Sequence, residues 1–156
     1  MTERAFMQRA VDLALEKMRA NSGGPFGAVI VRNNTIISEG WNEVTSSYDP
    51  TAHAEIVAIR RACARLGAFN LPDCDIYTSC EPCPMCLGAI YWARPSRVFY
   101  ASTAADAAAA GFDDAFIYEE LKKTAGLRQI PMSQLLREEA LAVFTAWRDL
   151  TTKTRY

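Results

Sequence analysis

The chain has 156 residues, of which 50% are hydrophobic and 22% are charged, and this composition fits one folded domain with a sizeable core. Its formal net charge of -1 argues against DNA or RNA as the main ligand, because proteins that bind such polyanions usually carry a basic face. Residues 1–20 lack the apolar core of a signal peptide, and no stretch approaches the length of a membrane span. An odd number of cysteines, 5, favours reduced thiols and a cytoplasmic location over a disulfide framework.

The first half of the chain predicts a helix, a strand hairpin and a second helix. Residues 3–20 have the pattern of an amphipathic helix. Residues 26–32 and 35–41 are largely apolar and predict two strands joined by a turn at Asn33-Asn34. The second helix is expected to end at Gly67. Its buried stripe comprises Ala52, Ile56, Ile59, Cys63 and Leu66.

The second half predicts further strands, each followed by a helix. The predicted elements are strands at 75–79, 97–101 and 128–130 and helices at 83–93, 103–110 and 116–121. Strands that alternate with helices indicate parallel strands with helices on their faces. Apolar residues recur at helical spacing in the tail, at Leu135, Leu136, Ala140, Leu141, Phe144 and Trp147.

Two short motifs carry the chemistry. Cys83 and Cys86 form a Cys-x-x-Cys pair that offers two thiolates to one cation. The chain has a single histidine, His53, which offers an imidazole. Catalytic zinc sites have three protein ligands and keep a fourth position for water. We therefore expect zinc on His53, Cys83 and Cys86. Glu55 completes the His-x-Glu and Pro-Cys-x-x-Cys signature of zinc deaminases.

Glu55 is expected to move protons to and from the zinc-activated water. Residues two apart on a helix do not face each other, so His53 and Glu55 can reach one atom only near the start of a helix. Residues 49–51 are the predicted start. Pro84 likewise suits the first turn of a helix, which makes Cys83 the expected N-cap. The ordinary role of a lone Glu is a solvated surface charge, but Glu55 stands beside the single histidine.

A competing ligand set remains open. Cys80 and Cys83 form a second Cys-x-x-Cys pair, so Cys80 can close a structural Cys3His site with the other three ligands. Such a site would make the chain a zinc-stabilised binding module. Against it, Cys80 ends a predicted strand, and a closed site leaves Glu55 without a role. Glu81 either belongs to the site or only orients Cys83.

The motifs resemble those of the cytidine deaminase-like zinc hydrolases, and among them the small bacterial guanine deaminases. The metal motifs lie in residues 49–55 and 78–93, and the first strand at 24–31 is also similar. The subfamily resemblance rests on residues 110–114 and 146–156. It implies an α/β fold of three layers, α/β/α, with a five-stranded mixed sheet whose first strand is antiparallel to the others. It also implies a homodimer in which a C-terminal segment, about 132–156, can cross to the partner.

The resemblance implies roles for individual residues. Zinc lies on His53, Cys83 and Cys86, and Glu55 shuttles protons. Asn42 and Asp114 contact the purine, and Tyr156 helps to cover it. Further candidate substrate contacts are Phe26, Ala54 and Trp92. The ordinary alternatives are a turn cap for Asn42, a helix start for Asp113 or Asp114, a frayed chain end for Tyr156 and core positions for the aromatic residues.

We therefore expect a zinc-dependent aminohydrolase that converts guanine to xanthine and ammonia. Water adds to C2, while Glu55 protonates the adjacent ring nitrogen and then the departing amino group. The same chemistry on guanosine, a pterin-like ring, cytosine or adenosine in a tRNA loop is the alternative. Enzymes that act on tRNA should carry a basic face, and here basic residues are dispersed among acidic ones.

Overall fold

A mixed sheet lies at the centre of the first of two compact units, Met1–Asp114 and Ala115–Tyr156. The structure is a computed structural model and describes residues 2–156. Within these residues the sheet has 4 strands in the order β2-β1-β3-β4. Their bounds are Gly27–Arg32 for β1, Thr35–Trp41 for β2, Cys74–Cys80 for β3 and Arg97–Ser102 for β4. β1 is antiparallel to β2 and β3, whereas β3 and β4 are parallel, so the prediction of a first strand antiparallel to the others is confirmed.

The prediction of a fifth strand at residues 128–130 was wrong, because this segment forms no strand. Polar groups of this segment bond to Glu120 and not to a neighbouring strand. Arg128 Nε donates to Glu120 O at 3.2 Å, and Gln129 N donates to Glu120 Oε2 at 2.7 Å. These local hydrogen bonds hold the segment beside helix α6 (Ala115–Lys122), so the backbone of Gln129 does not depend on a sheet for a partner.

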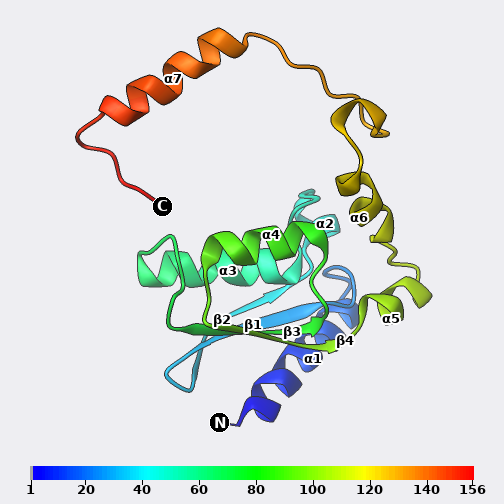
Figure 1. The fold of residues 1–156 in the computed structure, drawn as a ribbon. Coiled ribbons are helices and arrows are strands. Elements are labelled where there is room, and N and C mark those ends of the chain that lie inside the picture. The colour runs from blue at the N-terminus through cyan, green and yellow to red at the C-terminus, as the bar shows by residue number, and fades with distance from the viewer. Residues whose placement is uncertain (1) are drawn as a thin grey trace. The chain divides into compact units, whose positions relative to one another are not determined.

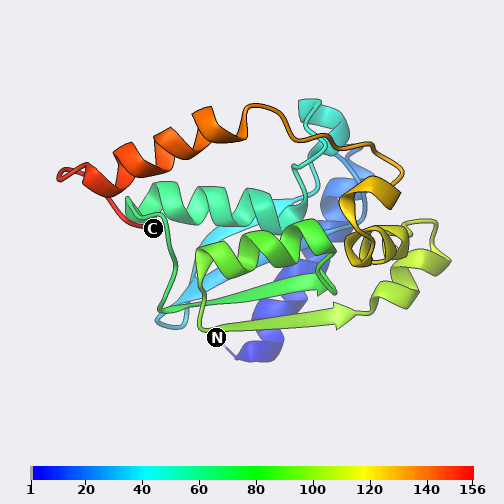
Figure 2. The ribbon, with the colours of Figure 1, turned by 45° about the horizontal axis from the view of Figure 1, so that its top comes forward.

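Helices cover both faces of the sheet, as predicted (Figures 1 and 2). Helix α1 (Glu3–Arg19) packs on β1, β2 and β3 from one face. Helices α3 (Ala54–Leu66) and α4 (Pro84–Ala93) lie side by side on the other face. Gly67, in the left-handed conformation with φ +61°, ends α3 at the residue that the sequence predicted.

Two apolar clusters fix these helices on the sheet. Ile30, Ile76 and Leu71 belong to the cluster on the side of α3 and α4. The cluster on the side of α1 contains Phe6 and Tyr77, whose ring centroids are 5.4 Å apart. Full burial of one large apolar side chain contributes about 1.5–3 kcal/mol, so a few such residues suffice to hold each helix in place.

Gly40 on β2 lets α3 approach the sheet closely. A Cβ atom at this position would lie 2.2 Å from Ala54 O and 2.5 Å from Ala58 N. No side chain fits between β2 and the first turns of α3. This contact sets the distance between the sheet and the start of α3, where His53 precedes the helix.

The remaining elements are short or belong to the second unit. Helix α2 (Val44–Ser47) was not predicted. Helix α5 (Ala104–Ala109) lies within the helix predicted at 103–110, and α6 extends the helix predicted at 116–121 by one residue at each end. The second unit also contains a 3-10 turn at Ala125–Leu127 and α7 (Arg137–Asp149), the helix expected in the tail. No residue of this unit is buried, so it builds no apolar core of its own. Among residues 2–156, no helix combines the length and the hydropathy needed to cross a bilayer.

Candidate active site

His53, Cys83 and Cys86 meet where two helices begin. His53 is the N-cap residue of α3, and Cys83 is the N-cap residue of α4, with Pro84 in the first turn. The Nδ1 atom of His53 lies 3.5 Å from the Sγ atoms of both cysteines. All three candidate ligand atoms lie within 4.8 Å of one another. The helix starts therefore bring three donor atoms from two distant stretches of chain to one point.

The spacing of these atoms suits one tetrahedral zinc ion. With Zn–N near 2.1 Å and Zn–S near 2.3 Å, nitrogen and sulfur ligands of tetrahedral zinc lie about 3.6 Å apart. The observed nitrogen–sulfur separations are 3.5 Å. One imidazole and two thiolates also form a typical zinc donor set, and three protein ligands leave one position for a water molecule. The residues present thus fit a catalytic zinc ion.

The two cysteines differ in acidity. Hydrogen bonds from Cys86 and His53 lower the pKa of Cys83 to about 4, so its thiolate forms readily. The same contact with Cys83, together with burial, raises the pKa of Cys86 above its usual range. The hydrogen bond between His53 and the Cys83 thiolate raises the pKa of His53. Zinc held by His53, Cys83 and Cys86 would require both thiols in their deprotonated form, which is the usual coupling between metal binding and ligand ionisation.

Cys80 does not join this group. Within residues 2–156, the cluster of possible metal ligands consists of His53, Cys83 and Cys86. The Sγ atom of Cys80 instead donates to Thr103 O at 3.6 Å, at the end of β3. The structure therefore disfavours a closed Cys3His site.

Glu55 lies beside the ligand group, in the first turn of α3, with 6% of its surface exposed. Its Oε2 atom is 3.4 Å from Cys86 Sγ. Burial raises the pKa of Glu55 above the usual range, and the negative charge of Cys83 adds to this effect. A carboxyl group with a raised pKa can both accept and donate a proton near neutral pH.

A cavity of about 310 Å³ borders the ligand group. It collects six of the predicted site residues, Phe26, Asn42, His53, Glu55, Cys83 and Asp114. Another part of its wall comes from α5 and the residues that follow, among them Phe112. The rings of Phe26 and Phe112 meet edge to face, with centroids 5.0 Å apart. The cavity thus offers aromatic surface next to the candidate zinc ligands.

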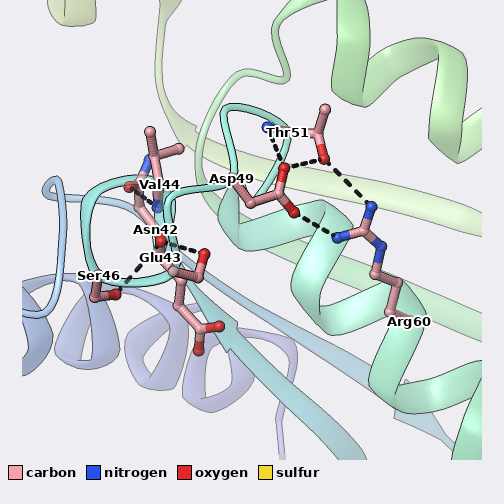
Figure 3. Close-up of polar contacts among 8 residues, drawn as sticks. Asn42, Glu43, Val44, Ser46, Asp49, Thr51 and Arg60 are labelled. Carbon is pink, nitrogen blue, oxygen red and sulfur yellow. Dashed lines mark hydrogen bonds and ion pairs between the residues drawn. The ribbon is translucent and has the colours of Figure 1, made fainter.

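Asn42 presents a donor to this cavity. It follows β2, and 9% of its surface is exposed. Its Oδ1 atom accepts hydrogen bonds from Gly24 N at 3.3 Å and from Val44 N at 3.2 Å, the second of which Figure 3 shows. Since two backbone donors occupy the oxygen, the Nδ2 group remains for a ligand. Asp114 also lines the cavity, and burial raises the pKa of its carboxyl, with a further contribution from the charge of Cys83.

The expected helix start at residues 49–51 was wrong, because α3 begins at Ala54. Asp49 Oδ1 accepts from Thr51 N at 2.8 Å and from Thr51 Oγ1 at 2.7 Å, which forms a local turn. Its Oδ2 atom accepts from Arg60 Nη1 at 3.1 Å (Figure 3). Since Arg60 belongs to α3, this network ties the loop before His53 to the helix that His53 caps.

Two predicted substrate contacts, Ala54 and Trp92, lie outside the residues that line the cavity. Ala54 is fully buried in the core cluster under α3. Trp92 lies on α4 with 64% of its surface exposed. Tyr156 belongs to the second unit, and its contact with the substrate stays a prediction. Glu81, for which the sequence allows either a place in the site or the orientation of Cys83, also lines the cavity.

Comparison with known proteins places this site in context. Residues 1–102 match the family model described as the cytidine and deoxycytidylate deaminase zinc-binding region. The chain is 60% identical to a guanine deaminase of Bacillus subtilis over 156 residues, which is 100% of both chains. The X-ray structure of a Bacillus subtilis guanine deaminase superposes with a TM-score of 0.98 and covers 100% of this chain and 99% of that chain. A tRNA-specific adenosine deaminase of Agrobacterium fabrum is 41% identical over 98 residues, 60% of this chain and 64% of that protein.

Proposed function

The chain belongs to the cytidine and deoxycytidylate deaminase family, and we propose that it hydrolyses guanine to xanthine and ammonia. The observation that carries the proposal is the 60% identity to a guanine deaminase over the whole chain. The similarity to the tRNA-specific enzyme covers 60% of the chain, and the net charge of -1 does not favour a polyanion. Ligand pockets span roughly 300–1,000 Å³, so a cavity of about 310 Å³ suits a free base.

Zinc is the cofactor that we assign to His53, Cys83 and Cys86, on the basis of the donor set and its spacing. When bound, zinc lowers the pKa of a water molecule towards about 7, which supplies the nucleophile at neutral pH. The protein contributes the orientation of the three ligands through the two helix starts. It also contributes Glu55, which needs no bond to the metal to take part.

Glu55 moves the protons of the reaction. It takes one proton from the water that adds to C2 of guanine and gives this proton to the adjacent ring nitrogen, N3. It then transfers the remaining hydroxyl proton to the 2-amino group, which leaves as ammonia while a carbonyl forms at C2. The raised pKa that burial gives to Glu55 suits both directions of transfer.

Asn42, Asp114 and Phe26 hold the base for this reaction. Asn42 donates from Nδ2 to an acceptor atom on the purine, and the Asp114 carboxylate accepts from a purine N–H. Phe26 offers aromatic surface to the ring. Guanine combines donors and acceptors on its edges, so it can satisfy both polar groups at once. An analogue without one of these groups would leave a buried polar side chain unpaired.

We further propose a cytoplasmic homodimer in which the segment of about residues 132–156 packs on a second copy. All 5 cysteines are free, which suits a reducing compartment. Leu141, Phe144 and Trp147 on α7 are exposed by 39%, 66% and 41%, and a second copy could bury them. Tyr156 would then reach the partner's cavity. Light scattering tests this arrangement, and a monomer at micromolar concentration would contradict it.

Ammonia release from guanine, guanosine, adenine, cytosine and cytidine tests the substrate assignment. We expect release from guanine with the zinc-loaded protein and none after the zinc has been removed with a chelator. A preference for guanosine would move the assignment to the nucleoside. A salt-dependent gel shift with tRNA, together with inosine formation, would support the tRNA alternative instead. Release from no base, with zinc held by four protein ligands, would indicate the binding module.

A further inference from the structure

We propose that Glu81 is a positioning residue that fixes the α5 segment, residues 103–114, against the loop that carries Cys83. The inference rests on the proposed function, because this segment supplies Phe112 and Asp114 to the substrate cavity. If the segment shifts, the acceptor that reads the purine shifts with it. Glu81 would therefore affect how the base is bound without itself taking part in the proton transfers.

The α5 helix cannot hold its own position. It has 6 residues, and none of them is buried. Isolated helices shorter than about 12–15 residues are marginal in water. A capping box joins Thr103 and Asp106: the Thr103 side chain accepts from Asp106 N, and the Asp106 side chain accepts from Thr103 N. This box stabilises the first turn internally, but it does not attach the helix to the sheet.

Besides the ring contact of Phe112 with Phe26, four hydrogen bonds join the end of β3 and Glu81 to the end of β4 and the start of the segment. Ser102 Oγ donates to Ser79 O at 2.9 Å, and Cys80 Sγ donates to Thr103 O at 3.6 Å. Glu81 makes the other two. Its N–H donates to Ser102 O at 2.8 Å, and its Oε2 atom accepts from Ala104 N at 2.9 Å. Among these four contacts, only the Glu81 carboxylate reaches α5 itself, since Ala104 is the first residue of that helix.

The chemistry of this contact makes it a strong anchor. The N–H of Ala104 is one of the first-turn donors that have no partner inside a helix. A carboxylate that accepts from such a donor forms a charge-assisted hydrogen bond, which is shorter and stronger than a neutral one. Glu81 also stands two residues before Cys83 in the chain. One side chain therefore links the zinc-ligand loop to the segment that carries Asp114.

The test compares Glu81→Ala and Glu81→Gln with Glu16→Gln, in the zinc-loaded full-length protein. Glu16 lies on α1 with a side chain that is 55% exposed, so its variant controls for the loss of one carboxylate. Because Glu81→Ala would displace the Asp114 carboxylate from the purine N–H that it accepts from, we expect the variant to weaken binding and raise KM for guanine about tenfold or more. The effect on kcat should be smaller, and zinc content should not change. Glu81→Gln keeps an oxygen acceptor for Ala104 and should recover most of the loss.

Amide hydrogen exchange gives a readout that does not depend on turnover. We expect faster exchange at residues 104–114 in Glu81→Ala and wild-type exchange in Glu16→Gln. Unchanged exchange and kinetics in Glu81→Ala would overturn the proposal, and so would loss of zinc, because Glu81 would then serve Cys83. An equal rise in KM in the Gln and Ala variants, with wild-type exchange at residues 104–114 in both, would point to a charge acting on the substrate and would also overturn it. If the wild type does not act on guanine, the proposed function fails, whereas the exchange data still decide the role of Glu81.

Discussion

His53 Nδ1 lies 3.5 Å from Cys83 Sγ, and each of the two residues is the N-cap of a helix. Two helix starts present partial positive charge to the same point, which is unfavourable for a bare cation. Two thiolates reverse this balance. Because the pKa of Cys83 is lowered to about 4, at least one thiolate is already present at neutral pH. The pairing of helix starts with thiolates therefore suits a cation that accepts sulfur ligands, such as zinc.

Cys83→Ser should abolish stoichiometric zinc binding and activity, because it removes a ligand at the N-cap of α4. Cys80→Ser should keep zinc, since its hydroxyl can still donate to Thr103 O, as the Cys80 thiol does. Metal analysis of the purified variants measures both effects. Equal zinc loss in the two variants would mean that Cys80 is a fourth ligand.

Glu55→Gln should keep zinc and lose turnover. The amide matches the shape of the buried carboxyl but cannot shuttle a proton, so kcat should fall by at least about 10²–10⁴-fold. Zinc content and kcat for guanine, measured on the same preparation, check this. An active and fully metal-loaded variant would remove Glu55 from the mechanism.

Asn42→Asp separates substrate recognition from folding. The carboxylate can still accept from Gly24 N and Val44 N, so the melting temperature should change little. It replaces the Nδ2 donor by an acceptor, so kcat/KM for guanine should fall on the order of a hundredfold or more. Asn42→Ala, which also loses both backbone contacts, should lower the melting temperature as well. Wild-type kinetics in Asn42→Asp would reduce Asn42 to a turn cap.

Gly40→Ala should destabilise the protein by about 1–3 kcal/mol, because overpacking displaces the start of α3. The new methyl group would lie 2.2 Å from Ala54 O, and His53 and Glu55 would move with the helix. Urea unfolding and zinc affinity measure the two effects. Gly88→Ala is the matched control, because a Cβ at this exposed helical position meets nothing within 4 Å. A destabilised Gly88 variant alongside an unaffected Gly40 variant would refute the packing argument.

Glu39→Gln should reduce stability at neutral pH but not in acid. Arg9 donates from Nε and Nη2 to the two oxygens of Glu39 at 2.7 and 2.9 Å and thereby lowers the pKa of that carboxyl below its ordinary value of 4.5. A lowered pKa in the folded state stabilises the protein above pH 4.5, and this contribution is lost as the pH falls through the lowered value. Unfolding free energies of wild type and variant should therefore converge as the pH falls from 4.5 through the lowered pKa of Glu39. Glu138→Gln removes an exposed carboxylate and is the control. Its unfolding free energy should stay close to that of the wild type at both neutral and acidic pH.

Local rules were sufficient where one residue determines a backbone position. Pro84 fixed the start of α4 and hence the place of Cys83, and Gly67 fixed the end of α3. Local rules failed where a partner outside the segment decides its conformation. The fifth strand was predicted from three residues, but contacts to Glu120 direct Arg128 and Gln129 elsewhere. Competition of this kind cannot be seen in a pattern of side-chain types.

The sequence also could not predict which groups in the cavity donate hydrogen bonds and which accept them. Asn42 could be assigned as a candidate contact, but whether it donates or accepts depends on Gly24, which lies 18 residues away. The contact between Glu81 and Ala104 spans 23 residues and has no motif of its own. Such long-range hydrogen bonds depend on strand pairing, and strand pairing is a property of the whole fold.

The two helix starts determine where this enzyme can change its length in evolution or in redesign. The ligands and Glu55 occupy two short stretches, 53–55 and 83–86, and one inserted residue in either would rotate a ligand away from its partners. The hairpin turn at Asn33-Asn34 lies at one end of β1 and β2. Gly27 and Trp41 lie at the opposite end, and they adjoin Phe26 and Asn42 of the cavity. Insertions there should be tolerated, so this turn is a suitable place to attach a tag or graft a peptide.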